Sequence, residues 1–236
     1  MTLQLKKVKP FAQGGNRLCF VHPDDPARCI KVRRPDFTLA DCRRKKGFPR
    51  NLRPLSSFDD NREEFRVMTT LENRYGEVLF HHVSRCYGFE GTDMGRGLVS
   101  ELIRNDDGRI SETLKKYLWD HGMDDPIVSA VKRFTDFWLA EGVPSRDLLL
   151  HNIVVQIEGG KIDRLVVIDG LGSSSFISAL GLPRYFSQRK AQRKIDNLHV
   201  RIEQLLGLRG GDMFPGYHGL LIHDGHSGSA PGENEN

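Results

Sequence analysis

A short polar segment followed by two β-branched runs constrains the fold of this 236-residue chain more than any other feature. Asp147 and Asn152 stand five positions apart, and a β-branched run follows Asn152 directly. A Gly-Gly turn at 159–160 leads to a second run, 165–168, which ends at Asp169. Two short strands joined by such a turn are typical of a β-hairpin. The hairpin would bring the three polar side chains together at one end of a sheet.

These three side chains suit a magnesium–phosphate site. Mg²⁺ prefers hard oxygen ligands and keeps several waters, so Asn152 and Asp169 would suffice as protein ligands. Asp147 would then orient an attacking hydroxyl or accept its proton. Asp and Asn are also common in exposed turns, and a turn without a function is the alternative. The residues upstream of this segment decide between the two interpretations.

A glycine turn near the N-terminus is the first upstream feature. Gly14 and Gly15 lie between two strand-like segments within residues 8–21. Glycine amides in such a turn can approach and bind phosphate oxygens. The last glycine of the G-x-G-x-x-G pattern is absent, so an ordinary hairpin turn is the alternative interpretation.

A lysine in an apolar strand is the second upstream feature. Lys31 lies in the predicted strand 27–32, and a buried lysine is costly unless its charge is paired. The apolar spacing predicts a helix over 60–75 with acidic residues in its first turn. Glu64 is the expected partner of Lys31, and Glu63 is the alternative. The alternative is that Lys31 lies on an edge strand and faces water, where it would have no such partner.

The rest of the chain reads as further strands and helices, one basic segment and a tail. Residues 33–58 are rich in Arg and Lys and are expected to form a surface insert, with a docking patch for an anionic partner as the alternative. Gly, Pro, His and Asn dominate residues 208–236, which predicts a flexible tail. Strands are expected over 83–89 and 97–103, and helices over 111–121, 125–141 and 188–206.

Composition excludes several classes of protein. The net charge of +4 is modest, and the basic segment has no known nucleic-acid reader motif, so a nucleic-acid partner is not expected. The four cysteines form no C-x-x-C pair, which argues against a zinc site. No apolar run approaches the ~18 residues of a transmembrane segment, and the N-terminus has no apolar signal core. These features predict a cytoplasmic protein.

Several groups of residues along the chain follow a known order and spacing: Arg17–Asp25, Arg28–Lys31, Arg62–Phe65, Asp147 with Asn152 and Ile153, and Asp169 with Gly172. In these residues the chain resembles the protein-kinase-like superfamily, and more closely the bacterial YrbL family of PhoP regulatory network proteins. The resemblance implies an α+β, two-lobed protein-kinase-like fold, with a small antiparallel β-sheet lobe over 1–103 and a short, mainly helical lobe over 104–207. The basic insert at 33–58 and the tail at 208–236 would be additions to this fold.

The resemblance also implies roles for the candidate residues. ATP and Mg²⁺ would lie between the lobes, with Asp147 as the catalytic residue and Asn152 and Asp169 as metal ligands. The nucleotide would be bound by Gly14, Gly15, Lys31 and Glu64, and adenine by the backbone of a hinge at Glu101 to Ile103.

Two departures from the kinase pattern bear on the substrate. Ser145 stands where the catalytic loop usually has histidine, and no A-P-E segment follows Asp169. A small-molecule or envelope-related acceptor is therefore favoured over a peptide. The expected function is an ATP-dependent phosphotransferase. The alternatives are a nucleotide-binding pseudokinase regulator and a binder of anionic partners through the basic insert.

Overall fold

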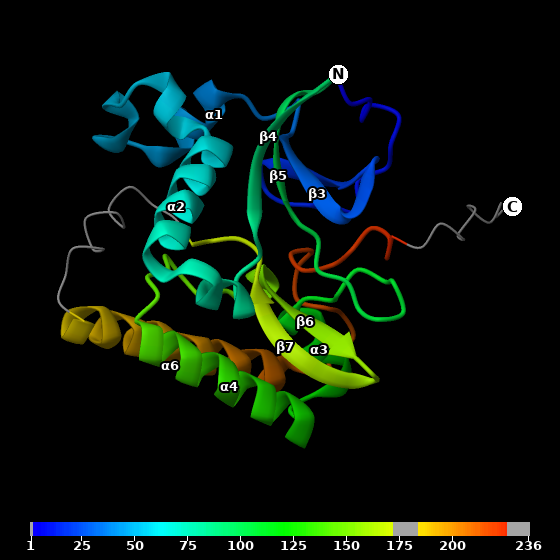
Figure 1. The fold of residues 1–236 in the computed structure, drawn as a ribbon, viewed down its shortest axis with the longest axis vertical. Helices are drawn as coiled ribbons and strands as arrows, with labels where there is room; N and C mark the ends of the chain where they lie inside the picture. Colours follow the sequence, from blue (N-terminus) through cyan, green and yellow to red (C-terminus); the bar gives the residue numbers. More distant parts are fainter. Residues whose placement is uncertain (1, 172–183, 226–236) are drawn as a thin grey trace, which may run out of the picture.

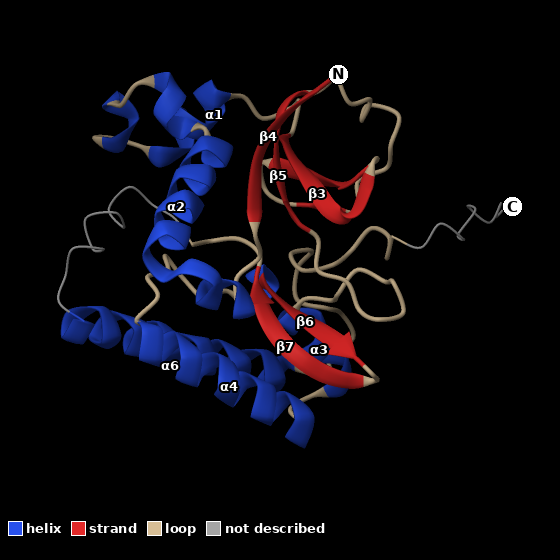
Figure 2. Cartoon of the chain, in the orientation of Figure 1, coloured by secondary structure: helices blue, strands red, loops and turns tan. Residues whose placement is uncertain are grey.

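The computed structural model describes residues 2–171 and 184–225. A small antiparallel sheet with one helix beside it forms the upper part of the molecule, and helices with a β-hairpin form the lower part (Figures 1 and 2). The expected α+β class, a small antiparallel sheet followed by a mainly helical region, is confirmed. No helix in the described part of the chain is both long and apolar enough to cross a membrane.

The sheet has five strands in the order β1-β2-β3-β5-β4. One face is apolar because alternate residues of the strands, including Phe20, Ile30 and Val99, pack against Leu3 and Leu5. Lys31 and its neighbours at alternate positions face the other way, toward the helical region. The strand bounds are β1 Ala12–Gln13, β2 Arg17–His22, β3 Asp25–Arg33, β4 Cys86–Thr92 and β5 Gly95–Glu101.

The basic insert and one long helix follow β3. The insert contains α1, Leu39–Lys46, which begins with a capping box between Thr38 and Asp41, and two short 3-10 turns. The next helix, α2, spans Asp60–Tyr75 as the apolar spacing predicts. Asp59 caps its first turn, since its side chain accepts a hydrogen bond from the Asn61 amide.

The helical region packs around a core of large apolar side chains. Phe134 and Trp138 of α4 are fully buried there. The predicted hairpin is present as β6 and β7, which pair in antiparallel register. The elements are α3 Leu114–His121, α4 Asp125–Glu141, β6 Ile153–Glu158, β7 Lys161–Val167 and α6 Arg184–Leu208.

Two helix starts differ from the prediction. Helix α3 begins at Leu114 rather than at residue 111, because Thr113 is the residue that caps it. Ser111 is buried instead, and its hydroxyl donates to Asn105 at 2.7 Å. Helix α6 is described from Arg184, four residues before the predicted start.

Candidate functional site

An ion pair between β3 and α2 is the first element of the site. Lys31 is 6% exposed, and its Nζ lies 2.7 Å from Oε1 of Glu64. The same ammonium donates to the carbonyl of Ile168, the residue before Asp169, at 2.8 Å. The structure thus brings Lys31 and Glu64 together, whereas no such contact joins Lys31 to Glu63. Burial alone would lower the pKa of Lys31, but the Glu64 and Asp169 carboxylates outweigh it and raise the pKa.

A second cation, Arg17, shares this site and was not among the residues predicted for it. Its guanidinium pairs with Glu64 and with Asp169, and it also donates to Asn61 at 3.1 Å. Arg17 follows the glycine turn directly after Asn16. Its place beside that turn is the signal that could have identified it.

The side chains of Asn152 and Asp169 and the backbone of Asp147 lie around one glycine. Gly170 has φ +85°, and a Cβ built there would lie 2.7 Å from Asn152 Nδ2 and 3.6 Å from the Asp147 carbonyl oxygen. The Gly170 amide donates to Asp169 Oδ1 at 2.6 Å. A side chain at 170 would therefore collide with the amide that the site needs, so glycine is required for space as well as for conformation.

The charge state of Asp169 follows from its neighbours. Desolvation alone would raise the pKa of Asp169, but the positive charges of Arg17 and Lys31 lower it to about 2. Asp169 is therefore ionised at neutral pH, in the state that binds a cation.

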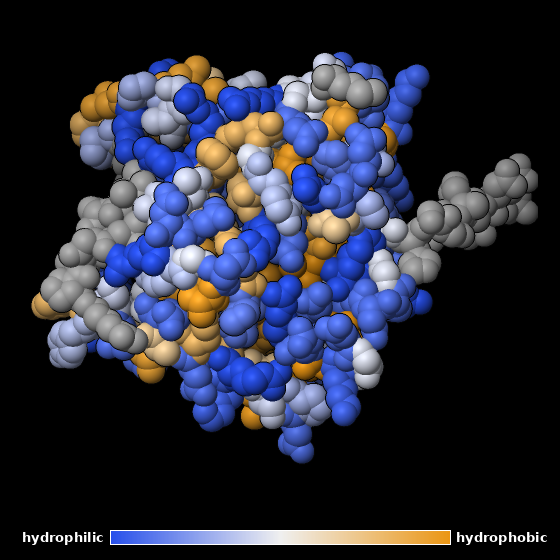
Figure 3. All heavy atoms as spheres, in the orientation of Figure 1, coloured by the Kyte–Doolittle hydropathy of each residue, from blue (hydrophilic) through white to orange (hydrophobic). Residues whose placement is uncertain are grey.

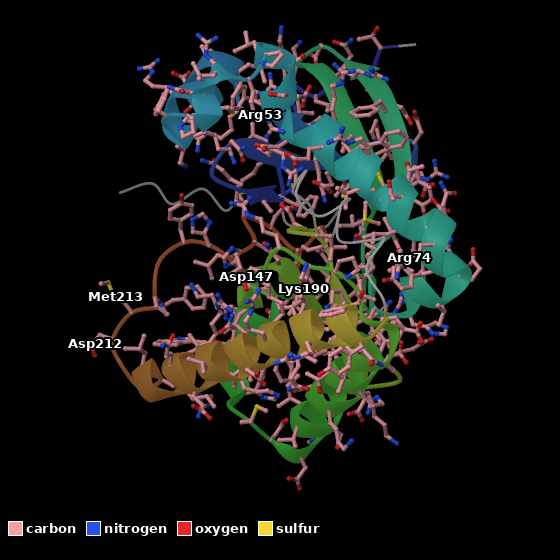
Figure 4. The ribbon with its side chains drawn as sticks, turned by 90° about the vertical axis from the view of Figure 1, so that its left-hand side faces the viewer. Arg53, Arg74, Asp147, Lys190, Asp212 and Met213 are labelled. Carbon is pink, nitrogen blue, oxygen red and sulfur yellow. The ribbon has the colours of Figure 1, made fainter. Side chains whose placement is uncertain are left out.

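Asp147 lies beside α6 (Figure 4) and pairs with a cation from that helix. Its Oδ2 lies 2.6 Å from Nη2 of Arg201, and both side chains are 29% exposed. Its Oδ1 is buried without a hydrogen-bond partner within residues 2–171 and 184–225, and the same holds for the hydroxyl of Ser145. Arg201 is a second residue that the sequence analysis missed, since nothing in its local pattern sets it apart from the other basic residues of α6.

The glycine turn joins β1 to β2, and the proposed hinge begins at the last residue of β5. Gly14 and Gly15 connect β1 and β2, and the Gly14 amide donates to the Arg17 carbonyl at 2.9 Å. Glu101 ends β5, and its carboxylate accepts from the Arg85 amide at 2.9 Å. Ile103 packs against the hairpin. Because the Glu101 carboxylate is bonded to the Arg85 amide, a nucleotide at this position would contact backbone atoms of the segment instead.

Residues of the tail pack against the glycine-turn strand and the hinge. The Ile222 amide donates to the Phe11 carbonyl at 2.7 Å. Leu221 packs on an apolar cluster that includes Phe11, Leu102 and Ile110. The sequence analysis did not anticipate these contacts.

The tail also contacts the helical region. The hydroxyl of Thr113 donates to the Gly219 carbonyl at 2.8 Å. The rings of His218 and His151 stack with their centres 5.2 Å apart. Burial, and then the neighbouring His218, lowers the pKa of His151. The described tail residues therefore connect the sheet to the helices at the edge of the candidate site.

The candidate metal ligands fit a magnesium ion that is shared with a phosphate ligand. Within residues 2–171 and 184–225, no group of three or more His, Cys, Asp or Glu side chains is placed to hold a metal. Mg²⁺ is commonly bound through one or two carboxylates together with substrate phosphates and waters. The Asp169 carboxylate and the side-chain oxygen of Asn152, on either side of the hairpin end, would supply a set of that kind.

Comparisons with known sequences find one family over most of the chain. A family model described as PhoP regulatory network protein YrbL matches residues 3–203. The proteins named YrbL of Escherichia coli strain K12 and of Shigella flexneri, both described as uncharacterized, are each 24% identical to this chain over 196 residues. These alignments cover 81% of this chain and 83% of each relative.

Comparison with solved structures identifies the fold. A crystal structure of Rad53 in complex with AMP-PNP has a TM-score of 0.51 at 14% identity and covers 86% of this chain. The chain spans about half of that structure, 51% of its length. The kinase domain of Mycobacterium tuberculosis PknI has a TM-score of 0.40 at 13% identity and covers 81% of this chain. The likeness to Rad53 confirms the expected two-lobed protein-kinase-like fold.

Proposed function

The chain belongs to the YrbL family and has a protein-kinase-like fold, and from this premise we propose that it is an ATP-dependent phosphotransferase. Its acceptor would be a small or envelope-related molecule rather than a peptide. The observation that carries the proposal is the buried ammonium of Lys31, held between Glu64 and the carbonyl that precedes Asp169. A buried lysine fixed by one carboxylate beside a second carboxylate is the arrangement that kinases use to bind phosphates.

The nucleotide would lie between the sheet and the hairpin. The Gly15 amide and the ammonium of Lys31 would bind its phosphates, while Glu64 would hold Lys31 in place. The Gly14 amide already donates to the Arg17 carbonyl, so Gly14 would shape the turn instead of binding phosphate. The backbone from Glu101 to Ile103 would contact adenine. The Rad53 structure with a similar fold contains AMP-PNP, which supports a nucleotide ligand for this fold.

The transfer step would be carried by positioning and charge neutralisation. Asn152 and Asp169 would hold Mg²⁺, which neutralises phosphate charge when bound. As the oxygen of the acceptor hydroxyl bonds to the γ-phosphorus, Asp147 would accept the proton of that hydroxyl. The bond from that phosphorus to the β–γ bridging oxygen would break, and ADP would leave with the electron pair.

Two cations occupy the carboxylates that this chemistry requires. Arg17 pairs with Asp169, so magnesium binding there requires the guanidinium to leave Asp169. Arg201 pairs with Asp147, and an acceptor hydroxyl has to approach the same carboxylate. In the proposed cycle both pairs open when ligands bind.

A nucleotide-binding pseudokinase regulator is the second candidate function. The ion pair of Arg17 with Asp169 favours it, because a cation already neutralises the carboxylate that would bind magnesium. Nucleotide binding without turnover would distinguish this candidate from the phosphotransferase.

A thermal-shift titration tests nucleotide binding. A ligand that binds only the folded state raises stability as its concentration exceeds Kd, so millimolar ATP with Mg²⁺ should raise the melting temperature. Asp169→Asn should remove the magnesium-dependent part, whereas Asp212→Asn, the same change at an exposed tail position, should not. ATP consumption with a panel of metabolites then tests for transfer. No shift of the wild-type protein with any nucleotide would contradict both candidate functions.

A further inference from the structure

Positive charge is concentrated in two segments of the chain. Residues 38–58 contain six Lys and Arg and one acidic residue, and residues 184–195 contain five Lys and Arg and none. The chain as a whole has 35 basic and 31 acidic residues, so the remainder has 24 basic and 30 acidic residues. The net charge of +4 thus conceals two strongly basic segments on a protein that is otherwise acidic, with a net charge of −6.

Both basic segments expose large apolar side chains. Phe48 and Leu52 of the insert are 81% and 74% exposed. Tyr185 and Phe186, at the start of α6, are 62% and 51% exposed. Figure 3 shows hydrophobic residues at the surface at the upper left, over the α1 segment and next to strongly hydrophilic ones. Exposed apolar groups amid cations favour a partner that offers both negative charge and an apolar layer.

The exposed residues of α6 form one face of the helix. At 3.6 residues per turn, positions 185, 186, 189, 190 and 193 lie within an arc of about 140°. All five are exposed, whereas Ala191, Ile195 and Leu198 on the opposite face are buried in the core. The cations and aromatics at the start of α6 therefore point away from the protein.

The insert and the start of α6 reach the same side of the molecule. Both lie at the left of Figure 1, and Figure 4, viewed from that side, shows Arg53 of the insert and Lys190 of α6. The insert also has a hollow lined by Ala40, Arg43, Arg44 and Asn51, which could receive a phosphate group. We name the exposed residues of 43–55 and 185–193 the basic face.

We propose that the basic face docks on an anionic phospholipid surface. Lys and Arg close to such a surface each strengthen binding by about fivefold, and exposed Phe, Leu and Tyr side chains insert at the lipid interface. The exposed Leu52 favours lipid over a nucleic acid, since a phosphodiester backbone offers no apolar layer to receive it. Docking would hold the candidate site close to lipid headgroups, but it is independent of phosphoryl transfer.

Vesicle co-sedimentation of the full chain tests the proposal. The protein should bind vesicles of phosphatidylcholine with phosphatidylglycerol and should not bind vesicles of phosphatidylcholine alone. Two triple variants each remove three exposed charges from the basic face, and each should bind at least about tenfold more weakly. They are Arg43→Gln/Lys45→Gln/Lys46→Gln and Arg189→Gln/Lys190→Gln/Arg193→Gln.

A matched control separates the basic face from net charge. Lys7→Gln/Lys132→Gln/Lys161→Gln also removes three exposed charges, from other surfaces, and should bind as the wild type does. Equal weakening by this control would overturn the proposal, because any loss of charge would then suffice. Melting temperatures of all three variants check that each is folded.

The apolar contribution has its own test. Phe48→Ser/Leu52→Ser keeps every charge, so only electrostatic attraction to the vesicles remains. Salt screens that attraction, so this variant should lose vesicle binding at a lower salt concentration than the wild type does. Unchanged vesicle binding by this variant, together with displacement of the vesicles by an RNA or DNA oligonucleotide, would overturn lipid docking in favour of a nucleic-acid partner. Absence of binding to the anionic vesicles would overturn it outright.

Discussion

The guanidinium of Arg17 pairs with the carboxylate of Asp169, which joins the start of β2 to the end of the hairpin. The same guanidinium pairs with Glu64 on α2. Three elements that are distant in sequence therefore meet at one cation, in the place where the proposed function requires phosphates and magnesium.

Replacing Arg17 tests whether it competes with magnesium. Arg17→Ala should bind Mg-ATP about tenfold more tightly, which corresponds to about 1.4 kcal/mol, because Asp169 no longer has to exchange a guanidinium for the metal. Isothermal titration with and without Mg²⁺ measures the change. Arg28→Ala, at a partly exposed cation on β3, is the control. Weaker binding by Arg17→Ala would show instead that Arg17 itself contacts the phosphates.

The pH dependence of stability should reflect the low pKa of Asp169. The pKa of this carboxyl is about 2 in the folded state and 3.8 in the unfolded state, so its ionised form stabilises the fold above about pH 4. This contribution is lost as the pH falls from about 4 toward 2. Arg17→Gln removes the main cause of the shift, so the stability difference between wild type and variant should shrink below pH 4. Urea denaturation at pH 7, 4 and 3 measures it, and a constant difference would contradict this account.

Glu64 should matter more for stability than Lys31 does. Glu64 pairs with both Lys31 and Arg17, and its side chain is 15% exposed. Glu64→Gln leaves two cations without that carboxylate and should cost about 3–5 kcal/mol. Lys31→Met keeps the pair between Glu64 and Arg17 and should cost about 1–3 kcal/mol. Urea denaturation gives both values.

The neighbouring glutamate is the control for that comparison. Glu63→Gln changes the same helix turn without touching Lys31 and should stay within about 0.5 kcal/mol of the wild type. If Glu63→Gln were as destabilising as Glu64→Gln, helix charge rather than the ion pairs would explain the loss.

Asp147→Asn separates an enzyme from a nucleotide-binding regulator. A positioned base contributes about 10²–10⁴-fold to rate, so phosphate transfer or ATP hydrolysis at saturating Mg-ATP should fall by that factor. Mg-ATP affinity and stability should change little, because asparagine can still accept a hydrogen bond from Arg201. Asp163→Asn, on the exposed side of β7, should retain the rate. Equal rates for Asp147→Asn and wild type would remove Asp147 from the chemistry.

Leu221 should compete with adenine. It packs on the apolar cluster that contains Leu102, and Leu102 lies within the segment from Glu101 to Ile103 where we propose that adenine binds. Leu221→Ala weakens this contact, so Mg-ATP should bind severalfold more tightly, as measured by isothermal titration. The adjacent Leu220 is 38% exposed, and Leu220→Ala is the control. Weaker nucleotide binding by Leu221→Ala would show that Leu221 forms part of the nucleotide pocket.

Local patterns were enough to predict much of the architecture. The β-branched runs around a Gly-Gly turn identified the hairpin, and its closure places Asn152 and Asp169 at one end. Helical periodicity from residue 60 placed Glu64 toward Lys31, because alternate strand residues and every third or fourth helix residue share a face. These predictions need only the period of an element and its neighbours in sequence.

Contacts between distant segments were beyond such patterns. Arg201 reaches Asp147 from a helix with many similar cations, so nothing local distinguishes it. The tail contacts depend mainly on backbone groups, such as the Ile222 amide and the Gly219 carbonyl. Backbone hydrogen bonds leave little trace in the residue types, which is why a segment rich in Gly and His suggested only a tail.

The packing of Leu221 on the apolar cluster that contains Phe11 has a consequence for biosynthesis. Ribosomes make the chain from its N-terminus, and domains begin to fold as they emerge. Sheet and hairpin can therefore assemble while residue 221 is still inside the exit tunnel. During that interval the apolar cluster at Phe11 and Leu102 lacks the leucine that packs on it in the finished fold. A nascent chain stalled before residue 221 would thus display this part of the site to chaperones and to nucleotides alike.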